Sequence, residues 1–148
     1  MLQNTTYIIL ADDDEDDRAF FADAFKDLKL ATKINLMEDG IRLMNHLNDE
    51  QNELPHIIFL DLNMPKKSGM ECLKEIKNNN RLAGIAIAIY STSASDEDVE
   101  ETFVQGANIY IKKPNDFKTL KNLLEDVVTI NWQYHTSNLN RDNFLLKM

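Results

Sequence analysis

The chain has 148 residues, a length typical of one domain, and 43% of them are hydrophobic, enough to bury a core. A formal net charge of −9 repels nucleic-acid phosphates, so direct binding of DNA or RNA is disfavoured. Cys72 is the only cysteine, which excludes an intramolecular disulfide.

Residues 1–6 lack a signal-peptide pattern, and no apolar run approaches the ~18 residues that a transmembrane helix needs. We therefore expect a cytoplasmic protein that does not associate with membranes.

Five apolar segments, each followed by a helical pattern, divide the chain. The strand candidates span 7–11, 32–36, 56–60, 85–90 and 108–112. Apolar residues recur at helical spacing after each one, for example Phe21, Phe25 and Leu28 after the first. Ser95 and Asn115 have the residue types of helix N-caps, so we expect the fourth and fifth helices to begin after them.

This alternation predicts an α/β fold in which helices cover both faces of a parallel sheet. In segment 32–36, Ile34 and Leu36 alternate with Lys33 and Asn35, a pattern that suits an edge strand. We expect the flavodoxin-like (βα)5 fold, a doubly wound five-stranded sheet of order 2-1-3-4-5. Its functional site lies outside the carboxyl ends of strands 1 and 3.

Acidic residues follow both of those strands directly. Asp61 comes straight after the apolar run 57–60, and residues 12–17 read DDDEDD. Each pair of like charges ~4 Å apart costs roughly 4 kcal/mol at an effective dielectric constant near 20, and a hard divalent cation removes this cost. Asp12, Asp13 and Asp61 therefore predict a Mg²⁺ site.

The other acids of this run have a simpler interpretation. Glu15, Asp16 and Asp17 suit a solvated helix N-terminus, where negative charge complements the helix dipole. An EF-hand is rejected, because Asp17 and Asp23 stand where that loop needs glycine and glutamate.

The ends of the fourth and fifth strands add a hydroxyl and an ammonium group. Ser91 opens the stretch STS, and Lys113 precedes a proline. Each alone could be a turn hydroxyl or a surface charge. Beside a metal and a carboxylate, however, the hydroxyl and the charge can bind a phosphoryl group.

Five stretches, in this order and spacing, carry a family resemblance: LADDD (10–14), FLDLNMP (59–65), SGMECLKEIK (68–77), YSTS (90–93) and GANIYIKKP (106–114). Together they resemble the receiver domain of bacterial two-component response regulators over residues 7–128. Among its members, the chain is most similar to stand-alone receivers related to phytochrome-partner regulators.

The resemblance implies a role for each matching residue. Asp61 is the phosphoacceptor, and Mg²⁺ is held by Asp12, Asp13, Asp61 and the carbonyl of Asn63. Further implied roles are phosphoryl contacts by Lys113, by Ser91 and by the backbone N–H groups of Leu62 and Thr92, and a switch formed by Ser91 and Tyr110. The peptide bond before Pro114 is usually cis in this family. Two departures are Ser91, where threonine is commoner, and Asp14, an additional carboxylate.

The expected chemistry is phosphoryl transfer to Asp61 from the phosphohistidine of a histidine kinase or a histidine phosphotransfer protein, followed by hydrolysis of the acyl phosphate. The chain then catalyses only its own phosphorylation and dephosphorylation. It signals through a changed protein-binding surface or relays the phosphoryl group. Two alternatives are an aspartate-nucleophile phosphatase, which needs an aspartate where Asn63 stands, and a pseudo-receiver that is never phosphorylated.

We assign residues 1–130 to the receiver domain and residues 131–148 to a C-terminal extension that is not a separate domain. Its apolar residues are Trp132, Tyr134, Leu139, Phe144, Leu145 and Leu146. We expect the extension either to continue the fifth helix and pack on the domain or on a second copy, giving a homodimer, or to be partly disordered.

Overall fold

The computed structural model describes residues 5–129 and 144–146. Strands and helices alternate along this part of the chain. Their bounds are β1 (Thr6–Ala11), α1 (Glu15–Asp27), β2 (Thr32–Met37), α2 (Gly40–Asn48), β3 (Ile57–Leu60), α3 (Gly69–Lys77), β4 (Ala86–Ser91), α4 (Asp96–Val104), β5 (Ile109–Lys112), α5 (Phe117–Thr129) and β6 (Leu145–Leu146).

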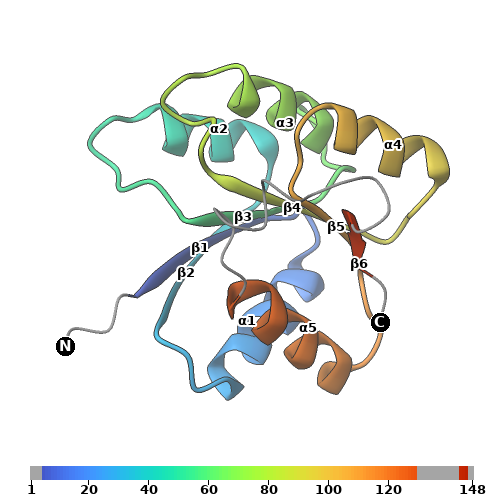
Figure 1. Cartoon of the computed structure of the whole chain (residues 1–148). Coiled ribbons are helices and arrows are strands. Elements are labelled where there is room, and N and C mark those ends of the chain that lie inside the picture. The colour runs from blue at the N-terminus through green and yellow to red at the C-terminus, as the bar shows by residue number, and fades with distance from the viewer. Residues whose placement is uncertain (1–4, 130–143, 147–148) are drawn as a thin grey trace.

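The strands form one parallel sheet of order β2-β1-β3-β4-β5-β6. Its first five strands confirm the predicted flavodoxin-like order. The two-residue strand β6, which the sequence did not predict, lies beside β5 (Figure 1).

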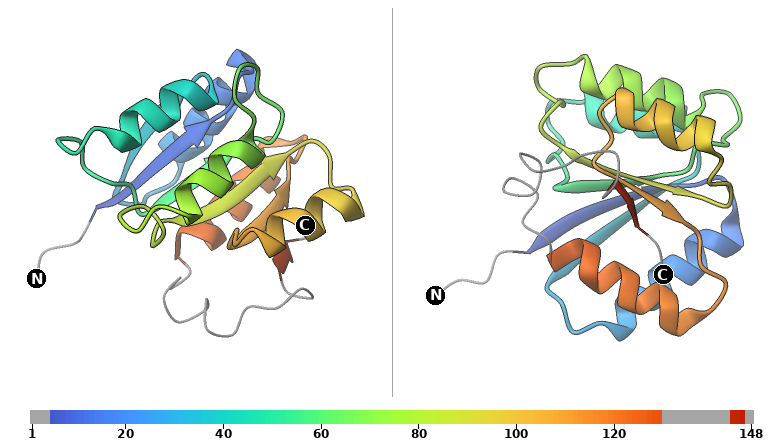
Figure 2. Two further views of the ribbon diagram at one scale, coloured as in Figure 1. Left: turned by 90° about the horizontal axis from the view of Figure 1, so that it is seen from above. Right: turned by 45° about the vertical axis from the view of Figure 1, so that its right-hand side comes forward.

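Helices cover both faces of the sheet, as the alternating pattern predicted. Helices α2, α3 and α4 lie on one face, and α1 and α5 lie on the other (Figures 1 and 2). Each face has its own apolar core. All four residues of β3 are buried, because a central parallel strand has helices on both sides.

The predicted edge strand does lie at the edge of the sheet. β2 pairs only with β1 among the described strands, and its residues are exposed or half-buried. Ile34 packs against the apolar core on the α1 and α5 side, whereas Leu36 and Lys33 are exposed, as suits a strand with a neighbour on one side only.

One of the two helix starts predicted from capping residues is confirmed. Ser95 caps α4 by accepting the backbone N–H of Asp98 at 3.1 Å. The expectation for Asn115 was wrong by one residue, because Asp116 accepts the backbone N–H of Thr119 at 2.9 Å at the start of α5. Both side chains satisfy a backbone donor that the helix leaves unpaired.

The C-terminal extension is described only in part. Helix α5 ends at Thr129, and the expected continuation of this helix falls at 130–143, outside the described residues. Residues 144–146 do pack on the domain, and Phe144 is fully buried. None of the helices in the described ranges is long and apolar enough to cross a membrane.

Candidate functional site

Four strand ends bring the predicted residues together at one edge of the sheet. Asp12 follows β1, Asp61 follows β3, Ser91 ends β4 and Lys113 follows β5. The hydrogen bonds between strands continue one residue past the ends of β3 and β5. The N–H of Asp61 donates to the carbonyl of Ala11 at 3.0 Å, and the N–H of Lys113 donates to the carbonyl of Ser91 at 2.8 Å. Parallel pairing therefore fixes the backbone on which these side chains stand.

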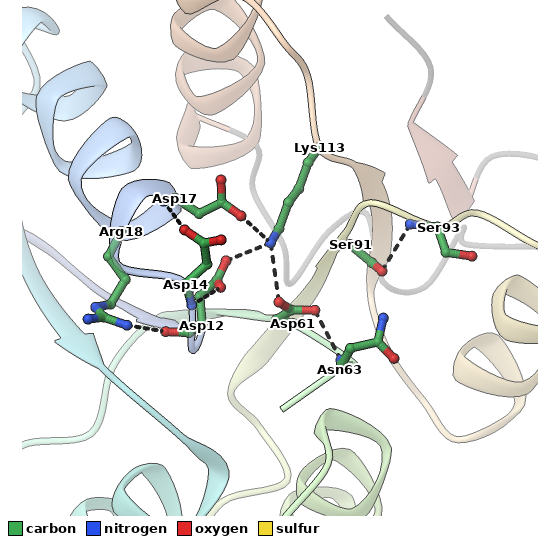
Figure 3. Close-up of polar contacts among 9 residues, drawn as sticks. All are labelled: Asp12, Asp14, Asp17, Arg18, Asp61, Asn63, Ser91, Ser93 and Lys113. Atoms are coloured by element: carbon green, nitrogen blue, oxygen red, sulfur yellow. Dashed lines mark hydrogen bonds and ion pairs between the residues drawn. The ribbon is translucent and has the colours of Figure 1, made fainter. Parts of the chain in front are cut away.

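The two buried carboxylates are held in the same way. Asp61 Oδ1 accepts the backbone N–H of Asn63, and Asp12 Oδ1 accepts that of Asp14, both at 3.0 Å. Such a side-chain turn two residues long is a common use of aspartate. In each residue it fixes one carboxylate oxygen and leaves Oδ2 to face Lys113 (Figure 3).

Lys113 is the positive centre of the site. Its Nζ lies 2.7 Å from Asp12 Oδ2, 2.8 Å from Asp17 Oδ2 and 3.2 Å from Asp61 Oδ2 (Figure 3). Burial opposes the charge of Lys113, but its hydrogen bonds to Asp12 and Asp17 outweigh burial and raise the pKa of this lysine. The ammonium group therefore stays charged at neutral pH.

Asp17 corrects the sequence interpretation. We expected it to be a solvated acid of the first helical turn, yet it pairs with Lys113 across the site. The sequence alone offers no signal that separates Asp17 from its exposed neighbours Glu15 and Asp16.

The acidic residues fit a divalent cation. One carboxylate oxygen from each of Asp12, Asp13 and Asp61 lies within 4.8 Å of the other two. Asp13 is exposed, whereas Asp12 is fully buried, and burial raises the pKa of Asp12 to about 6 against the attraction of Lys113. The ion pair with Lys113 is the polar contact of the buried Asp12 Oδ2 within the described part of the chain.

Two neighbours support this cluster without facing it. Asp14, whose role the sequence left open, caps α1 by accepting the N–H of Asp17 at 3.0 Å. Arg18, which sequence reasoning missed, donates from Nη1 to the backbone carbonyl of Asp12 at 2.8 Å. Both contacts hold the β1–α1 loop against the start of α1.

The predicted switch residues lie on neighbouring strands. Ser91 is fully buried, and its Oγ accepts the backbone N–H of Ser93 at 3.3 Å (Figure 3). Tyr110 is also fully buried, and its hydroxyl donates to the carbonyl of Ser93 at 2.5 Å. Burial raises the pKa of Tyr110 to about 12, which keeps this donor protonated. Leu62 and Thr92, the predicted backbone donors, directly follow Asp61 and Ser91.

The loop after Asp61 is tightly packed. A Cβ on Gly69 would come within 2.1 Å of the carbonyl oxygen of Asp61, so only glycine allows α3 to begin there. Lys66, in the same loop, has a φ of 68°, an uncommon value for a residue with a side chain. The expected cis bond before Pro114 was wrong, because no peptide bond among the described residues is cis.

Comparison with known proteins identifies the family. Residues 8–125 match the model of the response regulator receiver domain. The chain belongs to the response regulator receiver family. It is 30% identical to response regulator Rcp1 of Synechocystis over 124 residues, which cover 81% of this chain and 84% of that protein. It is 31% identical to the probable methanogenesis regulatory protein FilR2 of Methanothrix harundinacea over 123 residues, 81% of this chain and 79% of that protein.

Solved structures of receiver domains agree with this assignment. The Mn²⁺-bound form of Rcp1 superposes with a TM-score of 0.79 at 28% identity, covering 85% of this chain and 97% of that one. The phosphorylated cyanobacterial phytochrome response regulator RcpA gives a TM-score of 0.77 at 28% identity, covering 84% and 91%. This receiver domain is thus a phosphoacceptor module of two-component phosphorelay signalling.

Proposed function

We propose that Asp61 accepts a phosphoryl group from a phosphohistidine of a histidine kinase or a histidine phosphotransfer protein. The observation that carries this proposal is the seating of the Asp61 carboxylate. The backbone N–H of Asn63 donates to Asp61 Oδ1 at 3.0 Å, and Lys113 Nζ lies 3.2 Å from Asp61 Oδ2. Both contacts lie where the ends of four strands meet. A carboxylate oxygen attacks phosphorus, the P–N bond to histidine breaks, and an acyl phosphate forms.

The chain's own groups hold the transferred phosphoryl group. Lys113, whose raised pKa keeps it charged, pairs with a phosphoryl oxygen in place of part of its contact with Asp61. The hydroxyl of Ser91 and the backbone N–H groups of Leu62 and Thr92 donate hydrogen bonds to the remaining oxygens. Preorganised donors of this kind stabilise the charge that spreads over the equatorial oxygens in the transition state.

Mg²⁺ is the cation we assign to the acidic cluster. Asp12, Asp13, Asp61 and the carbonyl of Asn63 would hold it, a set of oxygen ligands that suits this hard ion. When bound, it neutralises charge on the phosphoryl oxygens. The existence of a Mn²⁺-bound form of the similar protein Rcp1 supports the binding of a divalent cation.

The acyl phosphate on Asp61 is lost by hydrolysis or passed onward. In hydrolysis water attacks phosphorus, the P–O bond to Asp61 breaks, and inorganic phosphate leaves, so the domain acts only on itself. The output is either a changed protein-binding surface near Tyr110 or relay of the phosphoryl group to another histidine. We include self-association of the chain as a homodimer in this proposal. We place this activity in the cytoplasm, in keeping with the free buried thiol of Cys72.

Intact mass after incubation with acetyl phosphate and Mg²⁺ tests the proposal. The parent protein should gain one phosphoryl group, and Asp61→Asn should gain none. Asp16→Asn, an exposed acid of the same acidic run, is the matched control and should behave like the parent. Unchanged incorporation in Asp61→Asn rejects the acceptor, and a parent that is never modified is a pseudo-receiver.

A further inference from the structure

The C-terminal residues 144–146, here called the C-terminal segment, occupy the edge of the sheet beyond β5. Strand β6 lies beside β5 (Figure 1). Leu145 pairs with Tyr110 and Leu146 with Ile111 in parallel register. Without the segment, β5 would present unpaired backbone groups at this edge. The segment therefore covers a surface on which another strand could pair.

Phe144 anchors the segment in the apolar core. Its side chain is fully buried and packs edge-on against Phe103 of α4, with ring centroids 5.3 Å apart, and against Tyr110 of β5 at 6.3 Å. Removing such a ring from water stabilises the docked segment. This contact accounts for the docking of a segment with only two residues in the sheet.

The same contact connects the segment to the candidate site. Tyr110 donates its hydroxyl to the carbonyl of Ser93, and the N–H of Ser93 donates to Ser91 Oγ. The backbone carbonyl of Ser91 in turn accepts the backbone N–H of Lys113. A continuous series of contacts thus runs from Phe144 through Tyr110 and Ser93 to the residues around Asp61.

We propose that the C-terminal segment is a latch that docks on β5 while Asp61 is unphosphorylated and is weakened by phosphorylation. This inference rests on the proposed function of Asp61. It assigns the segment a regulatory role, in which release uncovers the β5 edge of the sheet.

The direction of the coupling follows from the hydrogen bonds. When the Ser91 hydroxyl turns to a phosphoryl oxygen, the N–H of Ser93 loses its acceptor and the β4–α4 loop shifts. The buried Tyr110 hydroxyl must follow the Ser93 carbonyl, because an unpaired buried hydroxyl is costly. That movement alters the wall against which Phe144 packs. Because coupling is reciprocal, removing the Phe144 ring must favour the phosphorylated state.

Binding of beryllofluoride with saturating Mg²⁺, measured by calorimetry, tests the coupling. Phe144→Ala should bind this phosphoryl analogue about fivefold or more tightly than the parent, the lower range of typical allosteric coupling. Phe25→Leu, which removes a buried ring from α1 on the other face of the sheet, should bind as the parent does. Equal or weaker binding by Phe144→Ala overturns the latch.

Amide hydrogen exchange of residues 109–112 tests the docking itself. The backbone N–H groups of β5 that face β6 should exchange faster in Phe144→Ala than in the parent. Beryllofluoride should accelerate the exchange of the same groups in the parent. Unchanged exchange in both comparisons rejects the latch. Protection that rises with protein concentration shows docking onto a second copy and also rejects it.

The two proposals fail in different ways. If neither the parent nor Phe144→Ala binds beryllofluoride, the proposed function of Asp61 fails and the latch fails with it. If both bind it with equal affinity, only the latch is rejected.

Discussion

Asp12 shows how one buried residue sets a pH dependence for the whole fold. Burial raises its pKa from 3.8 to about 6, although Lys113 opposes this shift. The folded state therefore binds more protons than the unfolded state between about pH 4 and pH 6. By linkage, the free energy of unfolding contributed by Asp12 falls as pH rises through this window and stays low above it.

Asp12→Asn should remove this fall in the free energy of unfolding with rising pH, since the amide carries no charge to bury. At pH 7 without divalent metal, the variant should be more stable than the parent by about 1–3 kcal/mol, from roughly 1.4 kcal/mol per pKa unit. Urea unfolding with a chelator at pH 4 and pH 7 measures the effect. Asp23→Asn, a change at an exposed residue of α1, should lose as much free energy of unfolding between pH 4 and pH 7 as the parent does. The same loss in Asp12→Asn would contradict the assignment to Asp12.

At the scale of elements, the β3–α3 connection positions Asp61. The N–H of Gly69, the first residue of α3, donates to the carbonyl of Leu62 at 3.0 Å, and Ser68 and Glu71 form a capping box. Because of these contacts, α3 begins directly beside the backbone of Asp61. The close approach leaves no room for a side chain at residue 69.

Gly69→Ala should therefore force apart α3 and the loop that carries Asp61. We expect a loss of about 1–3 kcal/mol in the free energy of unfolding, as for overpacked cores, together with slower phosphorylation by acetyl phosphate. Gly84→Ala is the matched control, because a Cβ there would meet nothing within 4 Å. Equal stability of the two variants would show that the loop adapts at no cost.

At the scale of the whole molecule, the sheet brings together charges from distant parts of the chain. Lys113 pairs with Asp17, 96 residues away, and with Asp61, 52 residues away. This one ammonium group faces three carboxylates, those of Asp12, Asp17 and Asp61. Asp12 and Asp61 form the proposed metal site together with Asp13. Because the site exists only in the folded chain, a bound cation must stabilise the fold.

Millimolar Mg²⁺ should raise the melting temperature of the parent protein. At ~100 times the dissociation constant, binding adds about 2.7 kcal/mol to the free energy of unfolding. Asp13→Ala should reduce this response, whereas Asp16→Ala, an exposed acid of the same run, should retain it. Thermal unfolding with and without Mg²⁺ measures this response. If Mg²⁺ does not change the melting temperature of the parent protein, the metal site is refuted.

The sequence by itself determined the five-stranded order and predicted that the candidate site lies at the carboxyl edge of the sheet. A parallel strand covered on both faces must be apolar throughout, so 57–60 was recognisable as a central strand, and the polar alternation in 32–36 marked an edge. Asp61, Ser91 and Lys113 were found because each stands at or just beyond the end of such a strand. Local patterns are sufficient for these features, since they depend on residues close together in the chain.

Only the tertiary structure decided which side chains meet across long separations. Asp17, rather than Glu15 or Asp16, pairs with Lys113 because the pitch of α1 turns that carboxylate towards β5. Phe144 packs against the rings of Tyr110 and Phe103, a contact that no periodicity in the sequence predicts. Such contacts depend on how whole elements pack. Apolar side chains are buried, and charges paired, by residues that are close in space but distant in the sequence.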